Sequence, residues 1–487
     1  MTRTVTDIVA ALGTGIHVDG SWRDAASGAS FPVENPATGE VVATLADGGA
    51  DDAAAAIEAA ARTQESWAAV PARDRAEILR RAYELLTERT DEIALLMTTE
   101  MGKPLAEARG EVTYGAEFFR WFSEEACRIR GDARRSPDGK TRLIVTHEPV
   151  GPCILITPWN FPLAMATRKI GPAIAAGCTM VFKPANLTPL TSLYVVDVLR
   201  EAGLPDGVLN VVCTTDAGGV VEPWIDSGLA RKLSFTGSTP VGKTLLEQCS
   251  RQVMRTSMEL GGNAPFVVCE DADLDTAVTA AMAAKMRNMG EACTAANRIL
   301  VHRSVIDEFG RRLTERMAAL TVGDGAAEGT DVGPLVEDKA VAKVVELVDD
   351  AVGRGAEVLC GGTRPDGPGH FYPPTVLTGV HADSALMTTE IFGPVAALVP
   401  FDTDDEAVAM ANDTEFGLVS YVMTENIDRG LTYSERLQAG MVGINVGVVS
   451  NPAGPFGGIK QSGLGREGGL TGIEEFIETK LVAIPVR

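Results

Sequence analysis

The 487-residue sequence predicts an α/β protein with parallel sheets, and three observations support that prediction. From residue 153 onward, short apolar runs alternate with helical stretches, which is typical of parallel strands with helices packed on both faces. The length exceeds what one hydrophobic core usually serves, so two or three domains are expected. The composition, 45% hydrophobic and 22% charged with 51 glycines, is that of an ordinary soluble globular chain.

Composition and charge also restrict the partners. No window supplies the roughly 18 uninterrupted apolar residues of a spanning helix, and no secretion signal is seen, so we expect a cytoplasmic protein with no membrane partner. The net charge of −23 disfavours nucleic acid, and an anionic substrate would need a locally basic pocket. Eight cysteines without close pairs and five scattered histidines predict neither a disulfide framework nor a metal site.

The first 150 residues predict helices and then a hairpin. Alanine-rich segments between residues 51 and 130 carry apolar residues at helical spacing, which predicts three or four helices. The turn sequence 136–139 (SPDG) lies between two alternating runs and predicts a hairpin that projects from the body. The tail IEEFIETKLVAIPVR predicts a strand that pairs with this hairpin in a neighbouring subunit. Such pairing would make a homodimer or a homotetramer.

Four consecutive strands are predicted next, in the segments CILITPW, TMVFKPA, VLNVVC and KLSFTGS. The carboxyl ends of parallel strands meet at one edge of a sheet, where ligands bind, so the four following loops are the expected cofactor site. A second alternating block from Phe266 to about Phe401, with PFVVCE, RILVHRS and VAALVPF, is long enough to form a further domain.

One loop matches the phosphate-binding pattern G-x-x-x-x-G-K-[ST] at Gly237, Gly242, Lys243 and Thr244. A strand precedes this loop and a helix follows it, as the pattern requires. However, Pro240 places a residue without an N–H inside a loop that would have to work through its N–H groups. A P-loop NTPase is therefore kept only as a remote alternative.

Three side chains lie in contexts suited to chemistry. Cys293 follows a polar run broken by glycine, where a thiol has access and room for a substrate, although a structural cysteine is the better interpretation of it alone. Glu259 stands between apolar residues and before two glycines, so it is either a cap or a base whose pKa burial raises. Asn160 lies between two prolines in a stiff loop at a strand end, where it is either a turn residue or a fixed amide donor for an oxyanion.

Taken together, these segments resemble the aldehyde dehydrogenase superfamily over nearly the whole chain. The segments ITPWNFP, FKPAN, SFTGS, MELGGNAP, GEACTAANR, EIFGPV and PFGGIKQSGLGREGG occur in the family's order and roughly its spacing. Within the superfamily the chain is most similar to the succinate-semialdehyde dehydrogenases, through TRKIGPAIAAGCTM, RKLSFTGS, MRNMGEAC and NVGVVSNPAGPFGG. One such match would be weak evidence, but so many in order are very specific.

The resemblance implies a fold and its limits. It implies a Rossmann-like NAD(P)-binding domain over residues 1–129 and 147–257. An α/β catalytic domain would follow over 258–465, and residues 130–146 and 466–487 would form a small β oligomerisation element. The loop at Gly237 and Ser238 would then bind the pyrophosphate of the dinucleotide at a helix N-terminus, with Lys243 and Thr244 as first-turn helix residues.

The resemblance also implies catalytic roles. Cys293 would attack the aldehyde carbon as a thiolate, and the oxyanion would accept hydrogen bonds from the Asn160 side chain and the Cys293 N–H. Glu259 would activate the water that hydrolyses the resulting thioester. Ala295 stands where some semialdehyde enzymes carry a second cysteine, so no redox switch is expected.

The implied cofactor is NADP or NAD. The neutral Asn186 stands where NAD-selective members often carry a glutamate that repels a 2′-phosphate, so NADP is acceptable here. The expected cofactor-binding residues are Thr157, Pro158, Trp159, Lys183, Ala185, Asn186, Phe235, Gly237, Ser238, Leu260, Glu390 and Phe392.

The implied substrate is a small aldehyde with a terminal carboxylate. Arg168, Arg287 and Ser450 stand at the three positions that hold the far carboxylate in the semialdehyde enzymes, and a charge-assisted hydrogen bond is worth about 1.5–3 kcal/mol. Taken singly, the arginines would be interpreted as solvated helix charges. Met286 and Met289 could change the pocket's length, so glutarate semialdehyde or another aldehyde is the alternative to succinate semialdehyde.

Overall fold

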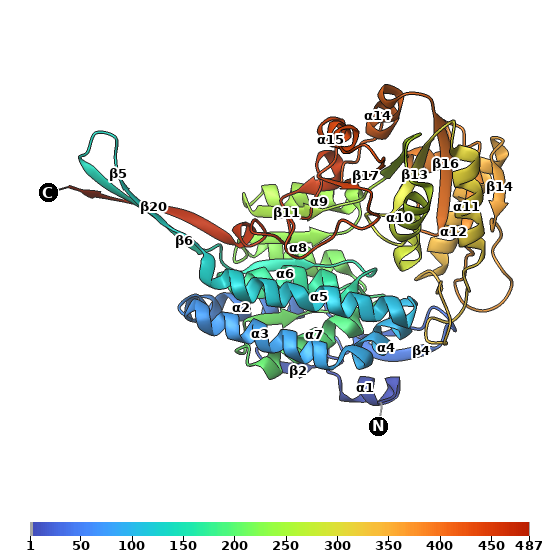
Figure 1. Ribbon diagram of the computed structural model, residues 1–487. Helices are drawn as coiled ribbons and strands as arrows, with labels where there is room; N and C mark the ends of the chain where they lie inside the picture. Colours follow the sequence, from blue (N-terminus) through green and yellow to red (C-terminus); the bar gives the residue numbers. More distant parts are fainter. Residues whose placement is uncertain (1–2, 487) are drawn as a thin grey trace.

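Two sheet-based domains and a projecting arm make up the computed structural model, which describes residues 3–486 (Figure 1). Met1, Thr2 and Arg487, which the predicted domain limits include, lie outside the described residues. The predicted mixture of helices with mainly parallel strands is confirmed. No helix in the described part of the chain is long and apolar enough to cross a bilayer.

The first sheet has eight strands, in the order β19-β11-β10-β7-β8-β9-β1-β2. Its five central strands run parallel, β19 and β1 on either side of them are antiparallel to them, and β2 at the far edge pairs antiparallel with β1. Four of the central strands are the ones that the sequence predicts. The strands are β1 (Ile16–Val18), β2 (Ser21–Arg23), β7 (Cys153–Ile156), β8 (Met180–Lys183), β9 (Leu209–Val211), β10 (Lys232–Thr236), β11 (Arg255–Glu259) and β19 (Gly463–Leu464).

Helices cover both faces of this sheet, because its central strands are buried on both sides. Alternate residues of β7 show the division: Cys153 and Leu155 belong to one core, whereas Ile154 and Ile156 belong to the other. The first core is completed by α3 (Ala72–Glu88), α4 (Thr90–Met101), α5 (Leu105–Glu125), α6 (Pro162–Ala176) and α7 (Pro189–Ala202). The second is completed by α2 (Ala50–Ala68), α8 (Ala217–Asp226) and α9 (Thr239–Ser250).

The second sheet has seven strands, in the order β14-β15-β16-β13-β12-β17-β18, parallel except for β14. Its strands are β12 (Ala264–Val268), β13 (Ala296–His302), β14 (Glu357–Cys360), β15 (Thr375–Thr378), β16 (Val395–Phe401), β17 (Val419–Met423) and β18 (Met441–Ile444). Its helices are α10 (Leu274–Met286), α11 (Ile306–Ala318), α12 (Asp338–Gly353), α13 (Ala385–Thr388), α14 (Asp404–Asn412) and α15 (Ile427–Arg436). The predicted second alternating block therefore forms a sheet of its own.

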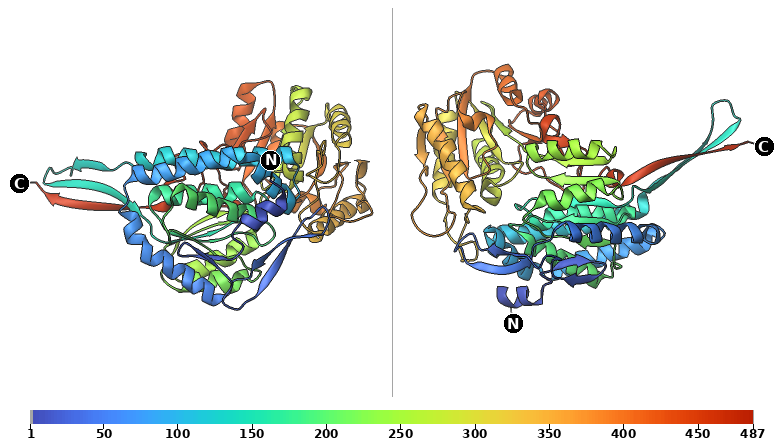
Figure 2. Two further views of the ribbon diagram at one scale, coloured as in Figure 1. Left: turned by 90° about the horizontal axis from the view of Figure 1, so that it is seen from below. Right: turned by 180° about the vertical axis from the view of Figure 1, so that it is seen from behind.

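A three-stranded antiparallel sheet forms the arm that projects from the body (Figures 1 and 2). It consists of β5 (Asp132–Arg135), β6 (Thr141–Pro149) and β20 (Ile477–Pro485), so the predicted hairpin is confirmed. The expected pairing of the tail with a neighbouring subunit is wrong, because β20 lies along β6 of its own chain. The Val150 N–H donates to the Phe476 carbonyl at 3.0 Å and anchors the tail at the base of the hairpin. The pairing of β20 with β6 continues from there toward the tip of the arm.

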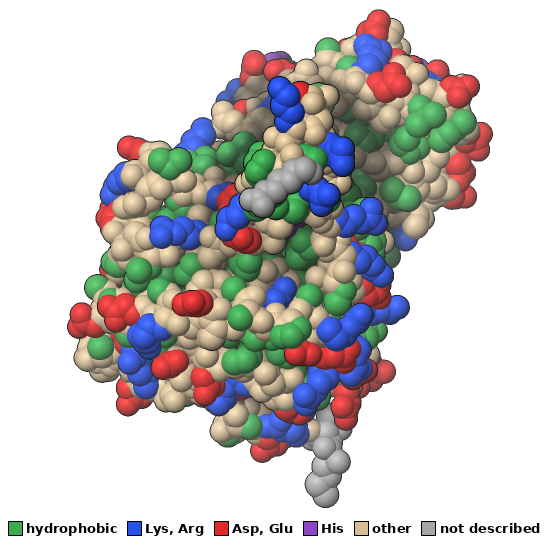
Figure 3. Space-filling model, turned by 90° about the vertical axis from the view of Figure 1, so that its left-hand side faces the viewer, with side chains coloured by type: hydrophobic (Ala, Val, Ile, Leu, Met, Phe, Trp, Pro, Cys, Tyr) green, Lys and Arg blue, Asp and Glu red, His purple; other side chains and the backbone are tan. Residues whose placement is uncertain are grey.

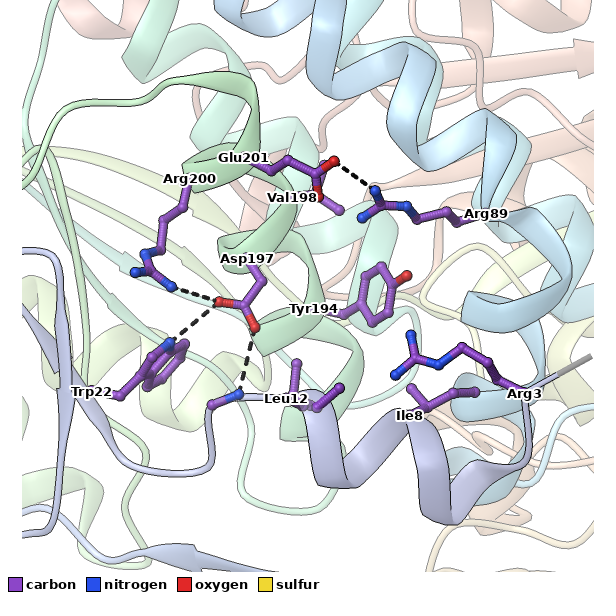
Figure 4. Close-up of a pocket in the computed structure, with 12 residues that line it drawn as sticks. Arg3, Ile8, Leu12, Trp22, Arg89, Tyr194, Asp197, Val198, Arg200 and Glu201 are labelled. Carbon is purple, nitrogen blue, oxygen red and sulfur yellow. Dashed lines mark hydrogen bonds and ion pairs between the residues drawn. The ribbon is translucent and has the colours of Figure 1, made fainter.

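The N-terminal segment adds elements that the sequence did not reveal. Helix α1 (Val5–Ala11) docks through Ile8, and β3 (Ser30–Glu34) pairs with β4 (Val41–Ala46) as a separate hairpin. A cavity of about 660 Å³ lies between α1, α7, Trp22 of β2 and Arg89, which precedes α4 (Figure 4). The arginines drawn in it have acidic partners, such as Glu201 with Arg89 at 2.7 Å. We interpret it as the seam where the N-terminal segment meets the domain.

Candidate active site

A cavity of about 330 Å³ lies where the loops after the first sheet face the second domain. The residues at its walls come from distant parts of the chain. Nine of those named by the sequence line it, namely Pro158, Trp159, Asn160, Gly237, Ser238, Leu260, Cys293, Glu390 and Phe392. Met165, Thr236, Gly261, Glu337, Lys339, Ala340 and Lys343 complete the lining. The structure thus brings together the expected nucleophile, the amide donor and most of the expected cofactor contacts.

Cys293 follows a short 3-10 helix, Arg287–Gly290, whose backbone is unusual. Asn288 and Met289 have φ angles of 54° and 55°, in the left-handed region that side chains normally avoid. Surrounding contacts hold this conformation, because the Asn288 N–H donates to Glu107 Oε2 at 2.6 Å and its side-chain amide donates to the Glu291 carbonyl at 2.9 Å. Such strain is typical of a loop that must place one side chain accurately.

Burial controls the protonation of the thiol. It raises the pKa of Cys293 to about 12, a rise that the Arg168 guanidinium opposes and that the Glu390 and Glu259 carboxyls add to. The free enzyme at neutral pH therefore holds a neutral thiol, and reaction requires that the proton be removed.

Asn160 faces the loop that carries Cys293. Its side-chain Nδ2 donates to the Glu291 carbonyl at 2.9 Å, and the Asn160 side chain is buried. Its backbone carbonyl accepts hydrogen bonds from Lys103 Nζ at 2.8 Å and from Asn288 Nδ2 at 3.1 Å. An amide fixed in this way can donate to charge that develops near the Cys293 sulfur.

Glu259, at the end of β11, lies outside the walls of this cavity. Its carboxylate lies against Gly457, where an added Cβ would be 2.8 Å from Oε1, and neither oxygen has a partner among the described residues. Burial and the neighbouring Glu467 carboxyl raise the pKa of Glu259 well above its usual range. Once ionised, such a carboxylate is a strong base.

Arg168 belongs to a buried cluster of charges beside Glu259. Its Nε lies 2.7 Å from Glu467 Oε2, and its guanidinium lies 4.0 Å from the Phe456 ring centroid. Lys169 Nζ bonds the other oxygen of Glu467 at 2.5 Å. Burial alone would raise the pKa of Glu467, but Lys169 and Arg168 lower it below its usual range. Arg168 thus already has a carboxylate partner within the chain.

A second cavity, of about 300 Å³, contains the other two expected substrate contacts. Arg287 and Ser450 line it together with Lys103, Glu107, Gly110, Glu111, Tyr114, Phe161 and Val448. The Arg287 guanidinium lies 4.9 Å from the Phe161 ring centroid and 5.6 Å from that of Tyr114, and it has no ion pair with any described residue. The structure does not bring Arg168 to this cavity.

The remaining cofactor candidates surround the carboxyl ends of the first sheet's strands. Lys183 is buried at the end of β8, where its Nζ donates to the Pro184 carbonyl at 3.0 Å, and burial lowers its pKa. Ala185 and Asn186 follow in the half-exposed loop before α7. The hydroxyls of Thr157 and Thr236 are buried and have no partner in the described part of the chain, so they can bind a polar ligand.

Two residues from the second domain close the cofactor side. Phe392 has a φ of 56°, and its ring packs edge-on against Trp159 with 5.4 Å between ring centroids. Glu390 Oε1 accepts a hydrogen bond from the Gly262 N–H at 3.1 Å. Burial raises the pKa of Glu390 to about 7, an effect that the Gly262 N–H and then Lys343 oppose.

The loop that matched the phosphate-binding pattern differs from that pattern in structure. Helix α9 begins at Thr239, so Pro240 already lies inside its first turn. Lys243 lies in the second turn, not the first as expected, and its Nζ donates to Gln461 Oε1 at 2.6 Å. Only Gly237 and Ser238, ahead of the helix, are left to meet a ligand phosphate.

Sequence reasoning missed several charged residues of the site, the buried Lys103, Glu111, Lys169 and Glu467 and the half-buried Glu107 and Lys343. One signal was available, because Glu107 and Glu111 stand four residues apart and therefore share a helix face just after Lys103. Lys103 pairs with Glu111 eight residues later, whereas Lys169 and Glu467 pair across 298 positions and left no local pattern.

Comparison with known proteins agrees with this geometry. A family profile described as the aldehyde dehydrogenase family matches residues 22–482. A succinate-semialdehyde dehydrogenase of Paenarthrobacter nicotinovorans is 57% identical over 91% of this chain and 99% of its own length. A glutarate-semialdehyde dehydrogenase of Pseudomonas putida is 50% identical over 96% and 97% of the two chains. A solved NADP-dependent enzyme of Escherichia coli, 47% identical, superposes with a TM-score of 0.96 over 98% of both chains.

We expect the alkylation of Cys293 by iodoacetamide in the free enzyme to accelerate about tenfold per pH unit between pH 7 and pH 10. A thiol whose pKa is about 12 stays mostly protonated over that range, and only the thiolate reacts. Mass spectrometry of the peptide that contains Cys293 would give the rate at each pH. A plateau below pH 9 would contradict a thiol that is neutral in the free protein.

Proposed function

The chain belongs to the aldehyde dehydrogenase family, and on that premise we propose that it oxidises succinate semialdehyde to succinate with NAD or NADP. The observation that carries the substrate is Arg287, a cation without an ion pair among the described residues, in a cavity that Ser450 also lines. An arginine there suits the terminal carboxylate of a semialdehyde. The name of the Paenarthrobacter nicotinovorans relative supports the same substrate.

A second candidate substrate is glutarate semialdehyde, and the name of a relative supports it. The Pseudomonas putida relative is named for glutarate semialdehyde, which is one methylene longer than succinate semialdehyde. The same guanidinium would bind either carboxylate, so the length of the pocket would decide between them. The P-loop NTPase alternative has no support from the comparisons and is withdrawn.

In the proposed mechanism the Cys293 thiol loses its proton to water, and the sulfur attacks the aldehyde carbon to form a thiohemiacetal. The oxyanion would accept hydrogen bonds from Asn160 Nδ2 and the Cys293 N–H, which donates to no other described residue. Oxidation then leaves a thioester on Cys293, and Glu259 would take a proton from the water that hydrolyses it. The raised pKa of Glu259 suits a base, because the ionised form binds that proton strongly.

The cofactor fits the residues present. The buried hydroxyls of Thr157 and Thr236 are available to a polar ligand, and the N-terminus of α9 at Ser238 favours a phosphate. Lys183 and Glu390 would hold the two riboses. When bound, the nicotinamide supplies the hydride acceptor that the oxidation requires. Asn186 carries no charge to repel a 2′-phosphate, so either dinucleotide is accepted.

The arm supports a homodimer or homotetramer. It has only three strands, and apolar side chains on both its faces are exposed, including Leu481 at 62% and Ile484 at 44%. Figure 3, which views the molecule along the arm, shows hydrophobic side chains spread over the face from which the arm projects. The outer edge of β20 is also free to accept a further strand. Because a small isolated sheet is only marginally stable in water, we propose that a second copy of this chain packs against the arm and covers its apolar side chains.

The activity itself is the first test. Purified enzyme with succinate semialdehyde and NAD or NADP should produce reduced nicotinamide, measured by its absorbance at about 340 nm, and should release no phosphate from ATP. Cys293→Ala should abolish the oxidation, since no thioester can form. Cys127→Ala, which removes an exposed thiol, is the matched control and should keep full activity. Turnover in Cys293→Ala would refute the covalent mechanism.

Replacement of Arg287 tests the substrate. With Arg287→Ala, kcat/KM for succinate semialdehyde should fall about 10- to 150-fold, the equivalent of one charge-assisted hydrogen bond of about 1.5–3 kcal/mol. The value for butanal, which has the same carbon chain without a carboxylate, should change less than about threefold. Arg287→Lys keeps the charge and should lose less than Arg287→Ala. Equal losses for both aldehydes would reject a carboxylate contact.

The arm should control assembly. We expect sedimentation velocity to show a dimer or tetramer, and Leu481→Asp to shift the protein toward smaller species, because a carboxylate in an apolar interface is costly. Val41→Asp, at a residue that is 58% exposed on the β3–β4 hairpin, is the control and should leave the mass unchanged. A monomeric parent protein at micromolar concentration would contradict the assembly.

A further inference from the structure

A buried ion pair lies directly beneath the loop that carries Asn160. Lys103 and Glu111 are each only 1% exposed, and the Lys103 ammonium bonds the Glu111 carboxylate. A buried pair costs so much desolvation energy that replacement by apolar residues is often neutral or stabilising. Stability therefore does not explain why the pair of Lys103 and Glu111 is present, but the contacts of the pair with the Asn160 loop do.

The pair holds the Asn160 loop at two points, the Asn160 carbonyl and the start of α6. Lys103 Nζ donates to the Asn160 carbonyl at 2.8 Å and lies 4.2 Å from the Phe161 ring centroid. Glu111 Oε1 accepts hydrogen bonds from the N–H groups of Leu163 and Ala164, at 2.9 and 3.1 Å, in the first turn of α6. One ionic unit therefore fixes both the peptide that follows the Asn160 side chain and the first turn of α6.

Helix α5, which carries Glu111, also fixes the loop that Asn160 faces. Glu107, one turn before Glu111 on α5, accepts the Asn288 N–H at 2.6 Å. The Asn288 amide then donates to both the Asn160 carbonyl and the Glu291 carbonyl, at 3.1 and 2.9 Å. Helix α5 thus sets the position of the Asn160 amide relative to the loop that ends in Cys293.

Lys103 has little freedom to move, because its own loop is clamped against the second domain. The Leu105 N–H donates to the Gly325 carbonyl at 3.0 Å. A Cβ on Gly325 would stand 2.6 Å from the Lys103 carbonyl, and one on Gly333 would stand 1.9 Å from the Gly102 carbonyl. Because the backbones pack this closely, the main chain of Lys103 is fixed against the second domain, and this limits where its ammonium can lie.

We propose that Lys103, together with Glu111, is a positioning residue that aims the Asn160 amide at the developing oxyanion. This inference rests on the proposed function, in which Asn160 donates to the oxyanion. A donor contributes fully only at the correct distance and angle, and a displacement of about 1 Å can cost about 100-fold in rate. Lys103 acts in this role through the Asn160 carbonyl and not on the sulfur, although it also lines the cavity that contains Arg287.

The test is a double-mutant cycle with Lys103→Met and Asn160→Ala, measured on the first turnover. Lys103→Met should slow the burst of reduced nicotinamide about 10- to 100-fold, with the KM for the aldehyde within about threefold of the parent. In the Asn160→Ala background, Lys103→Met should cost nothing further, because the donor that it aims is already absent. Alkylation of Cys293 by iodoacetamide, which needs no oxyanion donor, should proceed at the parental rate in every variant.

Two further variants separate positioning from stability. Lys232→Met removes an equally buried ammonium, at 0% exposure, from its partners Ser257 and Glu475, and it should lower the melting temperature while the burst rate stays parental. If Lys103→Met does not fold, the pair Lys103→Met and Glu111→Gln removes both charges, keeps an acceptor for the α6 N–H groups, and should show the same loss of rate.

The outcomes are distinguishable. Equal losses from Lys103→Met in both backgrounds, or a parental burst rate in Lys103→Met, would overturn the positioning role and leave the proposed function standing. A parental burst rate in Asn160→Ala would overturn the oxyanion role of Asn160 and this inference with it.

Discussion

The segment Leu260–Asn263 carries the chain from the first sheet into the second, and the site depends on how tightly this crossing is held. The Leu260 N–H donates to the Ser462 carbonyl at 2.9 Å, and the Ser462 hydroxyl returns a bond to the Gly261 carbonyl at 2.7 Å. The buried Arg298 guanidinium donates to the Asn263 carbonyl through two nitrogens, at 3.1 and 3.0 Å. A crossing with its polar groups paired in this way fixes one sheet against the other.

That crossing brings three chemically distinct groups together. Glu259 is the last residue of β11 and stands immediately before it. An added Cβ on Gly262 would stand only 2.4 Å from the Cys293 carbonyl, so only glycine allows the loop of Cys293 to approach. The Gly262 N–H also binds Glu390. A shift of the crossing would therefore move the expected base, nucleophile and cofactor acid relative to one another.

The sequence predicts those parts of the fold that local pattern determines. Four of the five central strands of the first sheet lie in short apolar runs bounded by turn residues, so their pattern is visible, whereas β11 (RTSME), β1 and β2 lie in no such run. The tail's strand and the hairpin that it pairs with were foreseen, but the pairing was expected between subunits, because no local pattern shows that β20 lies along β6 of its own chain. Within the site, Arg168 looked like a solvated helix charge, yet Glu467, almost 300 positions later, buries it. Pairing over such distances leaves no trace in a local window.

The loop that resembles a nucleotide triphosphatase motif has a physical explanation of its own. A Cβ on Gly237 would stand 2.4 Å from the Phe235 ring, and one on Gly242 would stand 2.4 Å from the Leu260 side chain. The first glycine lets the chain turn over the end of β10, and the second lets α9 approach the crossing between the domains. Both glycines of the pattern are therefore explained by close packing, which also brings the N-terminus of α9 to the cavity. The match to the motif arises because a tight strand, turn and helix unit imposes the same glycines whether or not a phosphoryl group is transferred.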